Sequence, residues 1–278
     1  MRINTNVAAM NTYSRLTAAN TAKSNSLAKL SSGSRINKAG DDAAGLAISE
    51  KMKSQIGGLT QAKRNAQDGI SLVQTAEGAL NESHSILERM RDLAVQGGNG
   101  TLTTDDRASI NKELGALHEE LTRISKTTEF NTKQVFSQDN KKAVAFTFQI
   151  GANSGQTLSV SVSAMDGTSL LVSDSTKFKL ADDGKNAGTM ISNIDKAIAT
   201  VSGQRATLGA VQNRLEHTIN NLTATNENLS DANSRIRDVD MAEEMMTFTK
   251  SNILSQAATS MLAQANAMPN SVLNLLQG

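Results

Sequence analysis

The sequence predicts a mainly α-helical protein, a long antiparallel coiled-coil helical bundle with paired N- and C-terminal helices and a small β-hairpin insert. Apolar side chains follow a four–three alternation over long stretches of the 278-residue chain. Aromatic residues make up only 3% of it, and Pro269 is its single proline. A core of Ala, Leu, Ile, Val and Met without rings fits slender helix–helix seams better than a thick two-layer core.

The longest predicted helix carries fourteen seam positions, of which eleven are apolar. Such a helix would span about 70 Å at about 1.5 Å per residue, and it should end at the glycine-rich segment 97–100. The seam comprises Ile48, Met52, Gln55, Leu59, Ala62, Ala66, Gly69, Val73, Ala76, Leu80, Ser83, Leu87, Met90 and Ala94.

A second helix should begin after Thr103, which with Asp106 three residues later resembles a capping box. The short glycine-rich link predicts that this helix is an antiparallel neighbour of the preceding one. Its seam comprises Ile110, Leu114, Leu117, Leu121 and Ile124.

A third long seam follows in the C-terminal half, and its strict seven-residue repeat predicts left-handed supercoiling. Gln204, Thr218 and Thr225 are its polar positions. The apolar members are Met190, Ile194, Ala197, Val201, Leu208, Val211, Leu215, Leu222, Leu229, Ala232, Ile236 and Val239.

A β-hairpin is expected between these helices, because apolar residues alternate on both sides of the turn segment 151–155. Two or three strands are not stable alone, so the hairpin must pack on the bundle. The alternating residues are Val144, Phe146, Phe148 and Ile150, then Leu158, Val160 and Val162.

The two ends of the chain have an unusual charge distribution. Residues 1–40 contain six basic side chains and no acidic one before Asp41, and residues 251–278 contain no charged side chain. An organellar transit peptide and a basic arm for nucleic acid are alternatives for the N-terminal segment. A helix that packs on a partner is favoured, because stacking aromatics are absent apart from Tyr13.

An apolar stripe on the C-terminal segment predicts an interface between subunits. If the N- and C-terminal helices paired only with each other, part of this wide stripe would stay exposed to water. This favours further copies of the chain as partners. Ordering such a tail costs on the order of 1–2 kcal/mol per residue, so we expect the tails to be disordered in the single chain and to fold on assembly. Pro269 predicts a kink near Met268. The predicted interface residues are Ile3, Val7, Met10, Leu254, Ala258, Met261, Leu262, Ala265, Met268, Val272, Leu275 and Leu276.

No pattern in the sequence indicates catalysis, a cofactor or a metal. The net charge of +1 gives no reason to expect nucleic-acid binding, cysteine is absent, and no apolar run is long enough for membrane insertion. A cleavable secretory signal is also absent from the N-terminus. His118 begins a zinc-protease-like motif, but position 122 is Thr where a second His is required, so we expect a solvated helix residue.

Both ends of the chain resemble bacterial flagellin. The similar stretches are residues 3–11, INTNVAAMN, and 30–49, LSSGSRINKAGDDAAGLAIS, with 234–242, SRIRDVDMA, and 261–266, MLAQAN. The resemblance covers roughly residues 1–138 and 188–278, and the insert is short compared with flagellins that bear large outer domains.

The resemblance implies a secreted structural subunit that polymerises into the extracellular flagellar filament for motility after type III export, and it implies no cofactor. Residues 1–40 with 240–278 would form an inner terminal-helix domain. Residues 41–138 and 188–239 would form an outer helical-bundle domain, with 139–187 as a short β insert that faces outward. The implied partners are copies of the chain, a secretion chaperone on the C-terminal helix, the filament cap and the hook-junction proteins.

Residues 87–96, LERMRDLAVQ, resemble the segment that an animal innate immune receptor reads in flagellins. The implied contacts are Arg89, Arg91, Leu93 and Glu113. Strongly recognised forms carry Val-Arg-Glu where this chain has Met90-Arg91-Asp92, and an ordinary charged helix face that packs on the next subunit is the alternative interpretation.

Two other functions fit the resemblance. A hook–filament junction adaptor of the same superfamily would share the termini but would not elongate. A flagellin with a metalloprotease insert would need more than the roughly fifty residues between the helices, because a catalytic domain must bury its own core.

Overall fold

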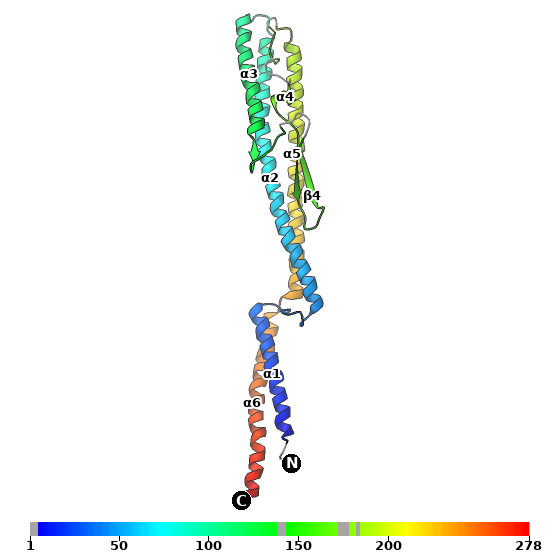
Figure 1. Ribbon diagram of the computed structural model, residues 1–278, viewed down its shortest axis with the longest axis vertical. Coiled ribbons are helices and arrows are strands. Elements are labelled where there is room, and N and C mark those ends of the chain that lie inside the picture. The colour runs from blue at the N-terminus through cyan, green and yellow to red at the C-terminus, as the bar shows by residue number, and fades with distance from the viewer. Residues whose placement is uncertain (1–4, 138–142, 172–177, 182–183, 278) are drawn as a thin grey trace. The chain divides into compact units, whose positions relative to one another are not determined.

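The computed structural model describes residues 5–137, 143–171, 178–181 and 184–277, with the side chains as far as Met268. Long helices dominate these residues, which confirms the predicted fold class (Figure 1). In chain order the elements are α1 (Val7–Ser32), α2 (Ala43–Gly97), α3 (Thr104–Thr127), β1 (Glu129–Phe130), β2 (Lys133–Gln134), β3 (Val144–Gln149), β4 (Thr157–Val162), α4 (Gly167–Leu170), α5 (Ala187–Arg237) and α6 (Met241–Gln277).

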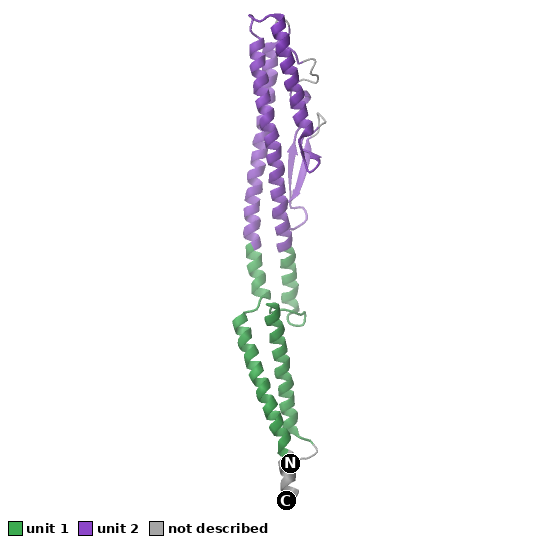
Figure 2. Cartoon of the chain, turned by 90° about the vertical axis from the view of Figure 1, so that its left-hand side faces the viewer, with its two compact units in different colours: residues 1–55, 227–278 green, residues 56–226 purple. Residues whose placement is uncertain are grey.

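The chain divides into two compact units (Figure 2). Unit 1 contains Met1–Gln55 and Glu227–Gly278, and unit 2 contains Ile56–Asn226. The β insert is not a unit of its own, because its described residues belong to unit 2 and bury side chains in the core of that unit. Unit 1 includes the first turns of α2 and the last turns of α5, whereas the sequence analysis placed these turns with the outer bundle.

The core of unit 2 lies along α2, α3 and α5, which run side by side in both views (Figures 1 and 2). Every predicted seam position of α2 from Leu59 to Ala94 is buried. The apolar seam positions of α5 from Met190 to Leu222 are also buried. The seven-residue repeat therefore predicted this core correctly, because it keeps one face of each helix turned towards its neighbours.

The predicted seam is wrong at the start of α2. Ile48 is 47% exposed, while Ser49 is fully buried. The buried face here begins at Gly45, where a Cβ atom would come within 2.8 Å of Cδ1 of Ile36. Ile36 is itself buried and comes from the loop after α1, so a contact distant from the helix repeat decides which face of α2 points inward.

The capping box of α3 is confirmed. The Thr103 hydroxyl accepts a hydrogen bond from the Asp106 amide at 3.2 Å, and the Asp106 carboxylate accepts one from the Thr103 amide at 3.0 Å. Hydrogen bonds from the Thr103 hydroxyl and amide to this carboxylate hold the pKa of Asp106 below its ordinary value. The backbone amides of Thr103 and Asp106 therefore both have hydrogen-bond partners at the start of α3, where amides otherwise lack a partner within the helix.

The expectation of a solvated His118 is wrong, because its side chain is buried. A Cβ atom on Gly167 of α4 would lie 2.8 Å from Nε2 of His118, and the Phe178 ring centroid is 6.0 Å from the imidazole. Both contacts come from the insert, which covers this face of α3. His118 and Ser125 are therefore buried where Leu117 and Ile124 were expected, and these two are half-buried.

The predicted β-hairpin is confirmed as antiparallel strands β3 and β4, in which Phe148 faces Leu158. The apolar residues of β4 are buried in the core of unit 2. Two side-chain amides attach the hairpin to the helices: Asn65 donates to the Gln149 carbonyl at 3.0 Å, and Gln204 donates to the Ser161 carbonyl at 3.1 Å.

A second, shorter hairpin pairs β1 with β2 and was not predicted. Its turn places Asn131 and Thr132 at φ angles of 50° and 63°, in the left-handed region. Two-residue strands have no readable alternation, so the sequence carried no signal for them.

Replacement of Leu80 by alanine should lower the free energy of unfolding by about 2–5 kcal/mol, because the side chain is fully buried in the α2 seam and its loss leaves a cavity. Denaturant unfolding followed by circular dichroism measures this loss. Asn81→Ala at the adjacent exposed position is the control, and it should change stability by no more than about 0.5 kcal/mol. Equal effects of the two changes would contradict the assignment of the core.

Replacement of Asp106 by asparagine should destabilise α3 in a pH-dependent way. Because the pKa of Asp106 is lowered in the folded chain, its contribution is present above the unfolded value of 3.8 and is lost as pH falls through the folded pKa. The difference in unfolding midpoint between parent and variant should therefore be largest near neutral pH. A difference that stays constant down to pH well below 3.8 would contradict this interpretation.

Candidate subunit interface on the terminal helices

Helices α1 and α6 of unit 1 lie side by side (Figures 1 and 2), and both have well-defined starts. The Asn6 side chain caps α1 by accepting from the Ala9 amide at 3.1 Å. Asp240 caps α6 by accepting from the amides of Ala242 and Glu243. Gly33 ends α1 at a φ of 68°, a conformation that favours glycine, and the chain there turns away from the helix axis.

A short bridge joins the two helices at this end. Ser34 pairs with Asp238 as an isolated antiparallel β-bridge, and the Arg35 amide donates to the Arg237 carbonyl at 2.6 Å. The Arg237 guanidinium in turn contacts the Glu50 carboxylate at 2.6 Å. These contacts tie the end of α1 to the end of α5 and to the first turns of α2 within unit 1.

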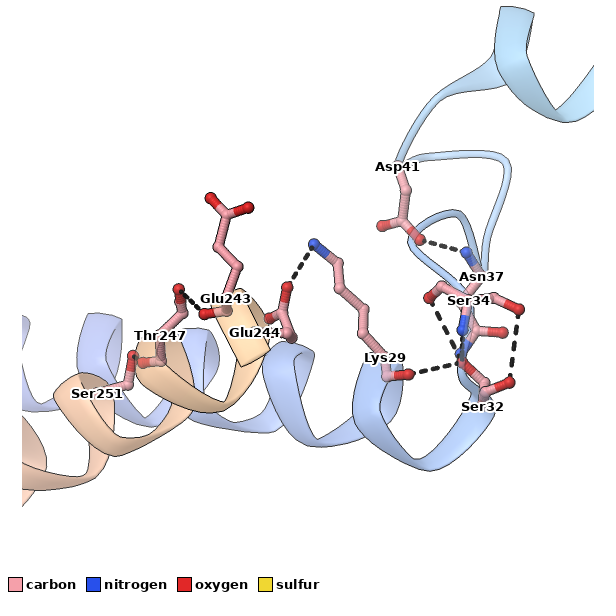
Figure 3. Close-up of polar contacts among 9 residues, drawn as sticks. All are labelled: Lys29, Ser32, Ser34, Asn37, Asp41, Glu243, Glu244, Thr247 and Ser251. Carbon is pink, nitrogen blue, oxygen red and sulfur yellow. Dashed lines mark hydrogen bonds and ion pairs between the residues drawn. The ribbon is translucent and has the colours of Figure 1, made fainter. Parts of the chain in front are cut away.

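The Asp41 carboxylate orders the loop that leaves α1 (Figure 3). It accepts hydrogen bonds from the amides of Asn37 at 3.0 Å and Lys38 at 2.9 Å. These backbone donors, Lys38 before Asn37, hold the pKa of Asp41 below its ordinary value. The loop therefore keeps a defined path from α1 to the buried Ile36 and on to α2.

The seam between α1 and α6 is small and partly polar. Among the described side chains, Ser26 is the most buried of α1 at 4% exposure, and Ser251 and Ala265 are the most buried of α6 at 6% each. The residues with reduced exposure follow a three–four alternation on each helix. They are Ala9, Thr12, Leu16, Ala19, Lys23, Ser26 and Leu30 on α1, and Glu244, Phe248, Ser251, Ser255, Ala258, Leu262 and Ala265 on α6, with Lys29 and Asn252 beside this alternation.

Four polar contacts cross this seam. Lys23 Nζ donates to Asn252 Oδ1 at 2.9 Å, and the Ser255 hydroxyl donates to Asn20 Oδ1 at 2.8 Å. Asn6 Nδ2 donates to the Ala265 carbonyl at 2.8 Å near the other end of the pair. At the bridge, the Lys29 ammonium lies 3.9 Å from the Glu244 carboxylate (Figure 3). The sequence analysis missed these residues, because isolated Asn, Ser and Lys side chains on a helix resemble solvated positions.

Large apolar side chains of both helices lie outside the seam. Leu254, Met261 and Met268 are seven residues apart on one line of α6, and they are 51%, 58% and 52% exposed. On α1, Val7 is 61% and Met10 is 64% exposed. Further exposed apolar residues of unit 1 that were not predicted are Tyr13, Leu27, Met241, Met245 and Met246.

The structure thus divides the predicted interface residues into two groups. Ala258, Leu262 and Ala265 belong to the seam with α1, so the four–three pattern on α6 combined two neighbouring stripes. Leu254, Met261 and Met268, with Val7 and Met10, form the outward group, which we call the apolar stripe. Ile3 lies outside the described residues, as do the side chains of Val272, Leu275 and Leu276. The backbone of α6 continues as one α-helix through Pro269, so the proline does not end it.

The residues that resemble an immune-receptor site lie in unit 2 and are bonded within the chain. The Arg89 guanidinium donates twice to one Glu113 oxygen, at 2.9 and 2.7 Å, and Arg91 donates to Asp195 at 2.8 Å. These side chains are about half exposed, so each pair adds about 0–1 kcal/mol. Leu93 is only 2% exposed and packs in the core, so its side chain is not on the surface of the free subunit.

Across the described residues, no cluster of His, Asp or Glu side chains could hold a metal ion. The helices searched in the same residues include none that is long and apolar enough to cross a membrane. The grooves along the described helices include one of about 430 Å³ between α2 and α3 and one of about 750 Å³ along α1 beside Tyr13.

Comparison with known proteins matches both halves of the chain. Residues 3–141 match the bacterial flagellin N-terminal helical region, and residues 191–276 match the bacterial flagellin C-terminal helical region. Flagellins of Bacillus subtilis and Halalkalibacterium halodurans are each 52% identical to the chain, and the alignments cover 100% of both partners. A solved structure of a putative flagellar hook-associated protein from Vibrio parahaemolyticus has a TM-score of 0.59 at 17% identity, over 71% of this chain and 100% of that one, and it shows the fold alone.

The two family matches span the terminal helices that carry the apolar stripe and most of the helices that form the core of unit 2. The full-length alignments include the insert as well. The chain belongs to the bacterial flagellin family, and it is a structural subunit of the extracellular flagellar filament rather than an enzyme.

Proposed function

We propose that α1 and α6 acquire their stable structure only when neighbouring subunits of the filament cover the apolar stripe. The observation that supports this is the exposure of more than half of the surface of Leu254, Met261 and Met268 in the single chain. A row of exposed apolar side chains on a helix is typical of a surface that binds another protein. Because the chain is a subunit of a polymer, we take another copy of the chain as the partner of this surface.

The energetics of the pair favour the same conclusion. Ordering the backbone costs on the order of 1–2 kcal/mol per residue, and an isolated helix does not offset that cost in water. The seam leaves most of its apolar side chains only partly buried, whereas full burial of one Leu or Met side chain contributes about 1.5–3 kcal/mol. Contacts to neighbours can supply this contribution at each position of the stripe, so folding and assembly become one reaction.

Within the filament, we assign residues 1–40 and 240–278 to the inner terminal-helix domain. Residues 41–138 and 188–239 would form the outer helical-bundle domain, and the insert 139–187 would face outward. The apolar stripe supports the first assignment, since the most apolar surface should lie where contact with other copies is most extensive. The self-sufficient core of unit 2 fits a position with fewer such contacts.

Other flagellar proteins would use the same terminal helices. We expect a secretion chaperone to cover the apolar stripe of α6 before assembly, and the filament cap and the hook-junction proteins to contact subunits at the two ends of the polymer. For the junction-adaptor alternative, the likeness to the Vibrio protein supports only a shared fold, and no observation favours it over the filament subunit.

An animal immune receptor is a further proposed partner. Arg89, Arg91 and Glu113 offer charged, half-exposed side chains on adjacent helices, and a receptor could take over their hydrogen bonds. Leu93 would support this surface from inside the core instead of touching the receptor. The same face could pack on the next subunit in the filament.

Replacement of Met261 by aspartate should abolish or strongly slow polymerisation, because burial of an unpaired carboxylate in an apolar contact is costly. Seeded growth of purified subunits, followed by light scattering and electron microscopy, measures the effect. Gln256→Asp is the matched control, since Gln256 is exposed on the same helix and lies off the apolar stripe. The control should elongate like the parent protein, and normal growth of the Met261 variant would refute the proposed interface.

A further inference from the structure

We propose that the polar contacts across the α1–α6 seam determine which faces of the two helices meet, and so keep the apolar stripe available to other subunits. Asn20, Lys23 and Asn252 are the positioning residues. This inference rests on the proposed function of the stripe, and it adds the reason why the stripe is not buried within its own chain.

The starting observation is that apolar side chains lie on both sides of the helix pair. Leu16, Phe248 and Leu262 have reduced exposure in the seam, whereas Leu254 and Met261 remain 51% and 58% exposed. The hydrophobic effect depends on the apolar area removed from water and is not directional, so it does not by itself select one of these faces. The observed facing of the helices therefore depends on an additional, directional interaction.

Specific hydrogen bonds provide that interaction. Lys23 to Asn252 and Ser255 to Asn20 connect side chains of the two helices in one antiparallel register, at 2.9 and 2.8 Å. Rotation of either helix would break both bonds and would leave the half-buried Lys23 ammonium and Asn252 amide without each other, whereas the exposed Asn20 amide can bond to water instead. Loss of a hydrogen bond at a partly buried polar group costs more than its formation gains, so the alternative facing is disfavoured.

The contacts extend over the length of the pair. The Ser34–Asp238 bridge fixes only the end of α1 next to the loop, whereas the Asn6 bond to the Ala265 carbonyl lies at the opposite end of that helix. In coiled coils, single polar residues in a seam specify register and partner at some cost in stability. In the same way, the polar contacts between α1 and α6 fix the facing of the two helices but add little to the stability of the pair.

Cysteine pairs can report the facing of the helices, because the chain contains no cysteine of its own. Leu16 and Ala258 both lie in the seam, at one level of the register that the Lys23–Asn252 bond defines. Tyr13 and Met261 lie at a similar level outside the seam and are exposed. A disulfide between Leu16→Cys and Ala258→Cys therefore reports the observed facing, and one between Tyr13→Cys and Met261→Cys reports the alternative.

The test compares these disulfides in two backgrounds. The contact-free variant carries Asn20→Ala, Lys23→Ala and Asn252→Ala, which remove the polar contacts without adding large apolar side chains to the seam. The control carries Lys23→Arg and Asn252→Asp, which keep a donor opposite an acceptor. Disulfide yield within one chain is measured by gel mobility, and seeded growth is measured separately on the two backgrounds without added cysteines.

In the control, the Leu16–Ala258 disulfide should dominate in filaments, and growth should match the parent. In the contact-free variant, assembled under the same conditions, the Tyr13–Met261 disulfide should form at least as readily as the Leu16–Ala258 disulfide, and growth should fall about tenfold, which corresponds to about 1.4 kcal/mol. Dominance of the Leu16–Ala258 disulfide in the variant, or growth equal to the control, would overturn the inference.

Two further measurements keep the result interpretable. Helical content by circular dichroism shows whether the triple variant folds, and Lys23→Ala alone, tested with the same cysteine pairs, replaces it if it does not. Failure of the proposed function is a separate result: normal elongation of Met261→Asp would show that the stripe is no interface, whatever the disulfides report.

Discussion

The structure depends on one mismatch, between the small, partly polar surface that α1 and α6 share and the larger apolar surface that they leave uncovered. Inside the pair lie serine, alanine and threonine with three leucines and a phenylalanine that are only partly buried, and a lysine bonded to an asparagine. Outside lie leucine and methionine side chains that are more than half exposed. A single chain cannot bury both surfaces at once, so the stable state of this part of the molecule includes its neighbours.

Unit 2 shows the contrast within the same chain. Its seams carry large side chains such as Leu80, Leu114 and Leu215 on facing helices, and these are fully buried. The insert adds cover, because β4 and Phe178 pack over the helices. This unit meets its own need for apolar burial, which suits a subunit that must keep one folded part while another part waits for assembly.

The sequence predicted most of the fold because a seven-residue repeat has only one interpretation when it continues for many turns. It failed where distant contacts decide burial. Ile36 sets the buried face at the start of α2, and the insert covers His118 on α3.

The candidate interface was predictable only in part. The apolar character of α6 was visible, but Leu254 and Ala258 are four residues apart and could share one stripe in any sequence-based analysis. Only the position of α1 shows that Ala258 faces inward while Leu254 faces outward. The polar contacts of Asn20 and Lys23 carry no repeat and no motif, so they could not be recognised without the structure.

The most direct test is amide hydrogen exchange of α1 and α6, measured on dilute monomer and on filament. Coupling of folding to assembly predicts fast exchange in both helices of the monomer, slow exchange in the filament, and slow exchange of the α2, α3 and α5 core in both states. Equally slow exchange of α1 and α6 in the dilute monomer would contradict the account, because the pair would then be stable without neighbours.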